Sequence, residues 1–259
     1  MAQQYNRKES LAALLEKRAE LDRTFAERLK KSILQEAITG RLVPQDPNDE
    51  PASVLLDKIR KEKARLVKEG KLKKKDLEEK AISEDEIPFE IPESWEWVRL
   101  GYLVDFSKSN SVKSESINKT DWILDLEDIE KDSGKLLRKK TMQESDAKSD
   151  KHVFYKGNVL YSKLRPYLNK VIIADANGYC TSEILAFDFG LIYNKYALYY
   201  LMSPFFVKYA MSDAYGVKMP RLGSKQGNAA LFPLPPLAEQ NRIVAKIEQL
   251  MKEIDKLKA

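Results

Sequence analysis

The feature that most constrains the fold is the stretch 9–38, which contains neither glycine nor proline. Its apolar residues recur at intervals of three and four, the spacing that places side chains on one face of a helix. They are Leu11, Leu14, Leu15, Leu21, Phe25, Leu29, Ile33 and Ala37. The sequence therefore predicts one helix of roughly 45 Å, since each residue adds about 1.5 Å. Because the apolar stripe is narrow and its flanks are charged, this helix needs a partner helix to be stable.

The C-terminal segment PLPPLAEQNRIVAKIEQLMKEIDKLK supplies a second helix of the same kind. Its apolar residues alternate at intervals of four and three, the a/d pattern of a coiled coil. A short run of this kind is also compatible with an ordinary helix packed on a core. Because each end of the chain carries an amphipathic helix in need of a partner, we expect the two to pair. The residues expected at this coiled-coil or dimer contact are Leu21, Phe25, Leu29, Ile243, Ile247, Leu250, Ile254 and Leu257.

A connection and a second helix follow the first one. Three prolines between 44 and 51 exclude helix and favour an extended path along the surface. The segment 52–69 then predicts a helix with one apolar face that stops at Gly70. Residues 58–75 carry a net charge of +8 and residues 76–93 a net charge of −7. The basic run suits a phosphate-binding patch, but the adjacent acids favour a solvated helix face followed by a charged linker.

The character of the sequence changes near Trp95, where aromatic residues appear and apolar positions begin to alternate. β-Branched and aromatic content predicts strands at 120–126, 153–161, 170–175 and 183–189. Residues 194–211 predict a buried helix that is interrupted near Pro204. The expected fold class is therefore α+β, with one mixed α/β domain and long coiled-coil-forming helices from both chain ends. The expected divisions are a helical region at 1–94, the α/β domain at 95–233 and a C-terminal coiled-coil helix at 234–259.

Composition excludes several classes of protein. No run approaches the roughly 20 apolar residues that cross a membrane, so no membrane association is expected. The N-terminus has no apolar segment after a basic one, so no secretion signal is expected. Cys180 is the single cysteine, which excludes an internal disulfide and a cysteine-based metal cluster. We therefore expect a soluble, cytoplasmic protein.

The residue combinations that catalysis requires are not found in the sequence. His152 is the only histidine, so a histidine metal site or a Ser-His-Asp triad has little to work with. The loop 223–227 lacks the spacing of a phosphate-binding loop. The Pro235–Pro236 pair lacks the amide and the aromatic ring of a base-flipping methyltransferase motif. A Glu-x-Lys spacing typical of nucleases lies in the charged linker, where a chance match is expected. We expect a non-catalytic chain with no metal and no cofactor of its own.

What remains is recognition, and the segment VLYSKLRPYLNKV interleaves basic and aromatic residues on an expected strand-turn-strand. Alternation places Tyr161, Lys163 and Arg165 on one strand face, and Pro166 then turns the chain. Arginine and lysine suit guanine and phosphates, whereas asparagine suits adenine. An ordinary exposed strand face or surface loop has the same composition. The candidate DNA-binding residues are Lys163, Arg165, Tyr167, Asn169 and Lys170 here, Lys218, Arg221 and Lys225 in the loop 216–228, and Lys113 and Lys139 in two polar loops.

Several segments together resemble the specificity subunit of Type I restriction-modification enzymes. They are ILQEAITGRLVPQDPNDEPASVLLDKIRKEK, IPESWEWVRLG, GNVLYSKLRPYLNKV, MPRLGSKQGN and PLPPLAEQNRIVAKIEQLM. The resemblance touches nearly the whole chain, and its most specific parts are the AITGRLVPQDPNDEPA and PLPPLAEQ segments. It implies target recognition domains joined by helical regions, in a subunit that has no catalytic residues.

The resemblance also implies partners and a layout. The partners are double-stranded DNA, methyltransferase subunits that bind S-adenosylmethionine, and restriction subunits that use ATP and Mg. The usual chain of this family has two recognition domains, whereas this chain has one between helical segments. We therefore expect a homodimer, or a pair with a different half, in which the coiled coil sets the spacing of two half-sites. A helix of roughly 45 Å exceeds one DNA turn of about 34 Å, so unread base pairs would separate the half-sites.

Two other classes of function remain open. A scaffolding protein would use its coiled coil to bind only other proteins, and it would show no salt-dependent affinity for DNA. The specificity region of a fused methyltransferase-nuclease would be part of an enzyme, and its isolated chain would bind S-adenosylmethionine. The absence of base-flipping, phosphate-loop and nuclease motifs from the sequence weighs against the enzyme.

Overall fold

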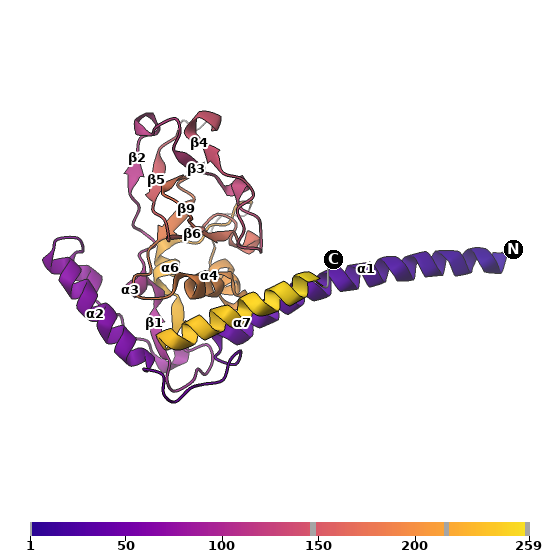
Figure 1. Ribbon diagram of the computed structural model, residues 1–259, viewed down its shortest axis with the longest axis horizontal. Helices are drawn as coiled ribbons and strands as arrows, with labels where there is room; N and C mark the ends of the chain where they lie inside the picture. Colours follow the sequence, from indigo (N-terminus) through magenta and orange to yellow (C-terminus); the bar gives the residue numbers. More distant parts are fainter. Residues whose placement is uncertain (1, 146–148, 215–217, 257–259) are drawn as a thin grey trace.

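The computed structural model describes residues 2–145, 149–214 and 218–256, apart from the side chains of residues 2–10, 19 and 21–23. Two long helices, α1 (Ala2–Ile38) and α7 (Leu237–Lys256), lie side by side, and α1 extends well beyond the end of α7 (Figure 1). A mixed α/β domain stands on the paired part of these helices (Figure 1). The expected α+β fold class is confirmed, and α1 begins earlier than the predicted residue 9.

Helices α1 and α7 run antiparallel within the one chain. Lys30 Nζ lies 2.6 Å from a carboxylate oxygen of Asp255, near the end of α7. Gln45, beyond the C-terminus of α1, donates to Glu239 at the beginning of α7 over 2.6 Å. Both helices contribute buried residues to one core cluster, namely Ala26, Ile33, Leu34, Ala37, Ile38, Ile243, Val244, Ile247 and Ile254. The predicted pairing of the two terminal helices is therefore confirmed, and it takes place within a single chain.

The residues predicted for the coiled coil have different positions. Those that lie in the core cluster or against it are Leu29, Ile243, Ile247, Leu250 and Ile254. Phe25 is 59% exposed and lies outside the intrachain contact that residues up to 256 make, because Asp255 of α7 already lies beside Lys30. Leu257 and the side chain of Leu21 fall outside the described part of the structure.

Helix α1 ends at Ile38, and Gly40 then adopts the left-handed conformation, with a φ of 73°. The amide of Arg41 donates to the carbonyl of Glu36, which closes the end of the helix. Helix α2 (Ala52–Lys68) packs Ala52, Leu55, Leu56 and Ile59 against the rest of the molecule. Several of its bases pair with acids, as the charge pattern indicated: Lys58 with Glu50, Arg60 with Asp57 and Glu79, and Arg65 with Glu62 and Glu69.

The α/β domain contains three small sheets in the described part of the chain. A two-stranded sheet pairs β1 (Glu96–Arg99) with β10 (Leu231–Leu234). A five-stranded sheet has the order β2 (Ser111–Val112), β5 (Lys151–Phe154), β8 (Gly178–Cys180), β3 (Trp122–Leu124) and β4 (Lys140–Thr141). A three-stranded sheet has the order β7 (Val171–Ile173), β6 (Val159–Ser162) and β9 (Ile184–Phe187). All pairs are antiparallel except β3–β8.

Helices and short 3-10 turns connect these strands. The helices are α3 (Leu100–Leu103), α4 (Asn194–Met202), α5 (Pro204–Ser212) and α6 (Ser224–Ala229). The 3-10 turns are η1 (Lys74–Leu77), η2 (Glu84–Glu86), η3 (Ser114–Ser116), η4 (Leu126–Asp128), η5 (Met142–Glu144) and η6 (Pro166–Leu168). The predicted interruption of the helix near Pro204 is confirmed, because Ser203 separates α4 from α5 and caps α5 by accepting from the amide of Phe206.

One predicted strand is wrong. Residues 153–161 were expected to form a single strand, but they belong to β5 and β6, which lie in different sheets. A turn at Tyr155–Asn158 separates them, and Gly157 adopts a φ of 92° there. This conformation favours glycine, since other residues meet a steric penalty at positive φ.

Buried tyrosines fasten α4 to strand β10. Tyr196 and Tyr200 are both fully buried, and their hydroxyls donate over 2.8 Å to the carbonyls of Pro233 and Leu231. The two rings also pack edge-on against Phe232. Because β10 leads directly into α7, this contact fixes the α/β domain on the paired helices.

A second joint links α7 to the connection that follows α1. Glu239 is fully buried and accepts from Trp95 Nε1 over 2.8 Å, in addition to its bond from Gln45. Arg242 forms a two-bond ion pair with Asp49, with distances of 3.1 Å and 2.6 Å. The PLPPLAEQNR segment, which carries part of the family resemblance, therefore joins the start of α7 to the connection after α1 and to the start of the α/β domain. None of the described helices is both long enough and apolar enough to cross a membrane.

Candidate nucleic-acid interface

The candidate site is built around the turn 163–169, which follows strand β6. The strand face expected to carry Tyr161, Lys163 and Arg165 does not form, because β6 ends at Ser162 and all of its residues are buried. Tyr161 is 3% exposed and packs edge-on against Phe206. The chain leaves the middle strand of the three-stranded sheet at this point, so the turn begins from a fixed position.

Two residues of this turn adopt the left-handed backbone conformation. Arg165 has a φ of 51° and Asn169 a φ of 49°, on either side of η6. Asn169 is 7% exposed, and its Nδ2 donates to the carbonyl of Met202 over 2.9 Å. The Asn169 amide group is therefore turned into the domain, where it braces the turn against the end of α4, and base contact by Asn169 stays a prediction.

Arg221 also has a partner within the domain. Its guanidinium forms a fork with the Glu183 carboxylate, with Nε and Nη2 lying 3.0 Å and 2.9 Å from Oε1. Its backbone pairs with Leu164 in an isolated antiparallel bridge. The carbonyl of Glu183 accepts from the amide of Lys163. Arg221 is thus a brace between the turn, the chain before β9 and the loop that follows α5.

Two of the predicted lysines are engaged in a similar way. Lys170 Nζ donates to the carbonyl of Leu126 over 2.6 Å, and burial lowers the pKa of this lysine. Lys139 Nζ lies 2.7 Å from Asp175 and 4.1 Å from the centroid of the Trp122 ring. Lys139 remains 41% exposed, so DNA could still compete for it, whereas Lys170 supports the polypeptide chain.

The other candidates lie on the surface. Lys113, Lys218 and Lys225 are exposed, Tyr167 is 48% exposed, and Lys163 and Arg165 are partly buried. The bridge between Leu164 and Arg221 brings the 163–169 turn and the 218–221 segment together. Lys113 lies beside β2 on the five-stranded sheet and Lys225 lies in α6. The candidates therefore form one joint cluster around Arg165, with Lys113, Lys139 and Lys225 elsewhere on the domain.

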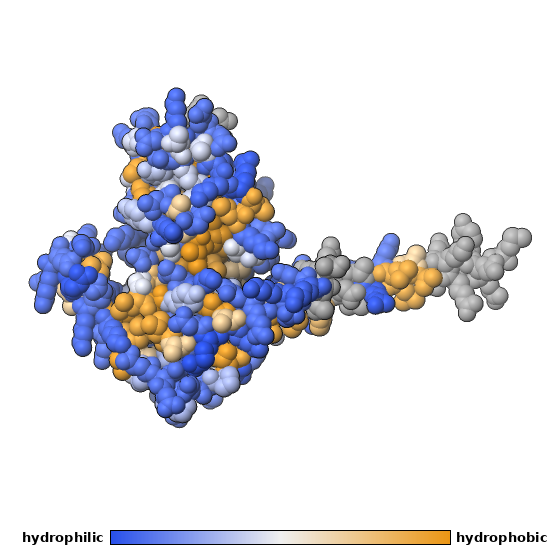
Figure 2. All heavy atoms as spheres, viewed as in Figure 1, coloured by the Kyte–Doolittle hydropathy of each residue, from blue (hydrophilic) through white to orange (hydrophobic). Residues whose placement is uncertain are grey.

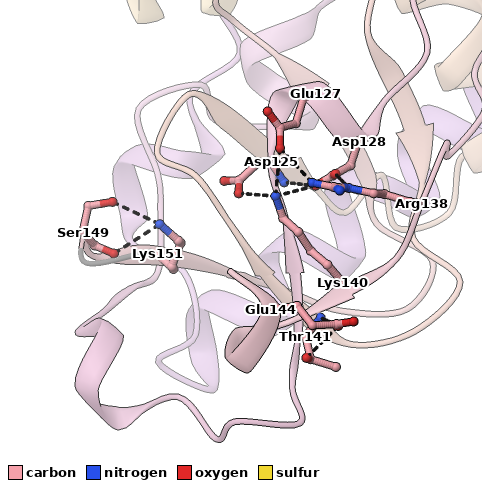
Figure 3. A network of polar contacts seen from close by, with 9 residues as sticks. All are labelled: Asp125, Glu127, Asp128, Arg138, Lys140, Thr141, Glu144, Ser149 and Lys151. Carbon is pink, nitrogen blue, oxygen red and sulfur yellow. Dashed lines mark hydrogen bonds and ion pairs between the residues drawn. The ribbon is translucent and has the colours of Figure 1, made fainter. Parts of the chain in front are cut away.

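A charge network that the sequence did not reveal shapes the β3–β4 region (Figure 3). Arg138 lies 2.8 Å from Asp128, whose side chain is fully buried. Lys140, 8% exposed, lies 2.8 Å from Asp125 and 3.3 Å from both Glu127 and Asp128. Burial opposes the charge of Lys140, but hydrogen bonds and charges from Asp125 and Asp128 outweigh it and raise the pKa of this lysine.

The network also explains the direction of Lys139. Successive residues of an extended chain point to opposite faces, so Lys139 lies on the other side from Arg138 and Lys140, over Trp122. The sequence signal was the acidic run 125–128 followed by the basic run 138–140, with no local pattern to pair them. Across the described residues, no group of three or more histidine, cysteine or acidic side chains is arranged to hold a metal ion.

Comparisons with known proteins agree with this architecture. Residues 92–259 match the model of the Type I restriction modification DNA specificity domain. The EcoAI specificity subunit of the Type I restriction enzyme from Escherichia coli is 37% identical over 242 residues, which cover 89% of this chain and 40% of that protein. The EcoEI specificity subunit from the same organism is 34% identical over 247 residues, covering 89% of this chain and 41% of that protein.

A solved structure supports the fold. The HsdS subunit from Thermoanaerobacter tengcongensis superimposes with a TM-score of 0.57 at 24% identity, covering 66% of this chain and 45% of that one. The chain thus spans about 40% of the length of the curated relatives that it matches.

Proposed function

Because the chain belongs to the Type I restriction modification DNA specificity family, we propose that it is a DNA-reading subunit with a single target recognition domain. In this proposal it directs methyltransferase and restriction subunits to a target site and performs no chemistry itself. S-adenosylmethionine, ATP and Mg are then bound by those partner subunits. The complex acts in the cytoplasm, where the DNA is.

The observation that carries this proposal is the construction of the fold. One α/β domain is fixed on an antiparallel pair of helices, and the joints at Glu239 and Tyr196 hold it there. A recognition domain needs such a mounting because its orientation relative to the partner subunits decides which bases it meets. The cluster around Arg165 supplies cationic groups of the kind that contact DNA.

The projecting part of α1 favours a second copy of the chain as a partner. Leu11, Leu14 and Leu15 are 58%, 61% and 57% exposed, and Phe25 is also exposed. They lie on the free part of the rod, and Figure 2 shows an apolar patch there. The segment from residue 2 to residue 25 is about 36 Å long at 1.5 Å per residue. Its middle lies near Leu14, so two antiparallel copies would bring this patch onto itself.

Such a dimer would carry its recognition domains at opposite ends of a continuous rod. Because α1 alone spans roughly 55 Å, the two domains would meet DNA more than one turn of about 34 Å apart. The target would then consist of two short half-sites separated by unread base pairs. Two identical copies would read an inverted repeat, and a pairing with a different half would read an asymmetric site.

The decisive experiment is to co-express this chain with its methyltransferase subunit alone and to map methylated adenines across the host genome. We expect a bipartite motif in inverted repeat. An asymmetric motif would contradict the homodimer and indicate a second half supplied by the host. A soluble, dimeric complex that methylates nothing would contradict the proposed function.

A further inference from the structure

The 163–169 turn has an unusual backbone for a surface turn. Across the described chain, the non-glycine residues with positive φ are Asp132, Arg165 and Asn169. These three residues belong to one neighbourhood, because the amide of Asp132 donates to the carbonyl of Asn169 and η6 joins Asn169 to Arg165. Backbone strain that concentrates in one place, and that its surroundings enforce, is typical of functional sites.

The surroundings do enforce this turn. The amide of Arg165 donates to the carbonyl of Pro220 over 2.7 Å, and its own carbonyl accepts from the amide of Leu168 over 2.9 Å. The amide of Leu222 donates to the carbonyl of Lys163 over 3.0 Å. With the Asn169 bond to Met202, two separate segments, 220–222 and the end of α4, hold the turn in place. The direction in which the Arg165 side chain leaves the backbone is therefore fixed.

The two arginines of this cluster differ in whether a carboxylate pairs with their charge. Arg221 is neutralised by Glu183, as described above. Arg165 has no carboxylate partner within residues 2–145, 149–214 and 218–256, and its Nε is buried without a hydrogen-bond partner. A buried donor on a charged group is costly unless something satisfies it. Because this Nε is closed off from solvent, an acceptor from outside the domain reaches Arg165 only through its two Nη groups.

We propose that Arg165 determines specificity in each half-site by donating two parallel hydrogen bonds to a guanine edge. This inference rests on the proposed function. A guanidinium with a fixed direction matches a pair of acceptors, and guanine presents O6 and N7 as such a pair in the major groove. A phosphate contact makes weaker demands on direction, and the exposed Lys218 of the same cluster is sufficient for it. Arg221 positions the turn and makes no contact with DNA.

The test compares Arg165→Gly, Arg165→Lys and Lys218→Ala in the complex with the methyltransferase subunit. Glycine relieves the positive φ and removes the guanidinium, so the turn stays folded. Lysine keeps the charge but loses the two-bond geometry. The readouts are the methylation motif and the binding of DNA duplexes with every base substituted in turn. The thermal midpoint of each variant shows that it is folded.

We expect both Arg165 variants to lose preference for guanine at one position per half-site, by about 10- to 100-fold, with the other positions unchanged. Lys218→Ala should weaken all duplexes equally. An equal loss at every position for Arg165→Gly would identify a phosphate contact and overturn the proposal, as would an unchanged motif. A wild-type complex without any motif would instead overturn the proposed function itself.

Discussion

Glu239 is a buried carboxylate whose two hydrogen bonds reach different parts of the chain. It accepts from Trp95 Nε1 at the start of the α/β domain and from Gln45 in the connection after α1. Glu239→Ala would leave the Trp95 donor buried without a partner, because Trp95 is 4% exposed. We expect this substitution to lower the free energy of unfolding by about 1–3 kcal/mol, measured by chemical denaturation.

The pH dependence of this effect has a definite sign. Burial raises the pKa of Glu239 above its ordinary value, although the bonds from Trp95 and Gln45 partly oppose it. The folded protein therefore holds this proton more tightly than the unfolded chain, and stability decreases as the pH rises from the ordinary carboxyl pKa of 4.5 through the raised value. Glu239→Gln should lack this component while keeping one acceptor. An alanine variant as stable as the wild type would contradict the role of Glu239 as a joint.

Individual contact residues were the hardest features to predict from the sequence. Arg165 and Arg221 look equivalent there, since each lies beside a proline in a basic segment. Glu183, which neutralises one of them, is 38 residues away from Arg221 in the chain. Asn169 looked like a residue that contacts adenine. Its bond to Met202 could not be predicted, because that bond depends on how α4 packs. Local patterns identify which segments carry charge, but only the folded chain decides which charges are already paired.

At the scale of elements, helices were predictable and strands less so. The periodicity of α1, α2 and α7 is a local property. The C-terminal ends of α1 and α2 and the N-terminal end of α7 could therefore be placed within a few residues. The division of 153–161 between β5 and β6 depends instead on sheet partners far along the chain. The pairing of α1 with α7 followed from two unpartnered stripes, but its antiparallel direction did not, nor did whether it forms within or between chains.

The C-terminal half of α7 is the element on which this pairing can be tested. Ile254 is 3% exposed, and Leu250 packs against the same core cluster. Replacing both with Glu would place two charges against the apolar face of α1, so we expect the end of α7 to detach. Hydrogen exchange of residues 247–256 should then approach that of an unprotected helix, and site-specific methylation should be lost.

Glu253→Ala is the matched control, because Glu253 is exposed on the same turn and, among the described residues, bonds only to Lys256. It should leave both exchange and methylation unchanged. Unaltered protection of α7 in the double Glu variant would show that the helix is held by its N-terminal joints alone.

At the scale of the whole molecule, the exposed stripe of α1 decides whether one chain is sufficient. Leu14 is 61% exposed and lies on the part of the rod that projects past α7 (Figure 1). Leu137, in a loop of the α/β domain, is 60% exposed and so makes a matched control. If the rod pairs with that of a second copy, Leu14→Glu removes one buried leucine per chain. Burying a leucine contributes roughly 1.5–3 kcal/mol, so the dissociation constant of the dimer should increase by about a hundredfold or more.

Light scattering over a concentration series measures this change directly. We expect Leu14→Glu to yield a folded monomer, because the side chain is exposed within its own chain and the substitution leaves the core intact. Leu137→Glu should remain dimeric. In the complex with the methyltransferase subunit, the monomeric variant should no longer methylate the two-part motif, since a single recognition domain reads one half-site. Equal dimerisation of the two variants would exclude the α1 stripe as the interface. The length of α1 would then not set the spacing of the half-sites.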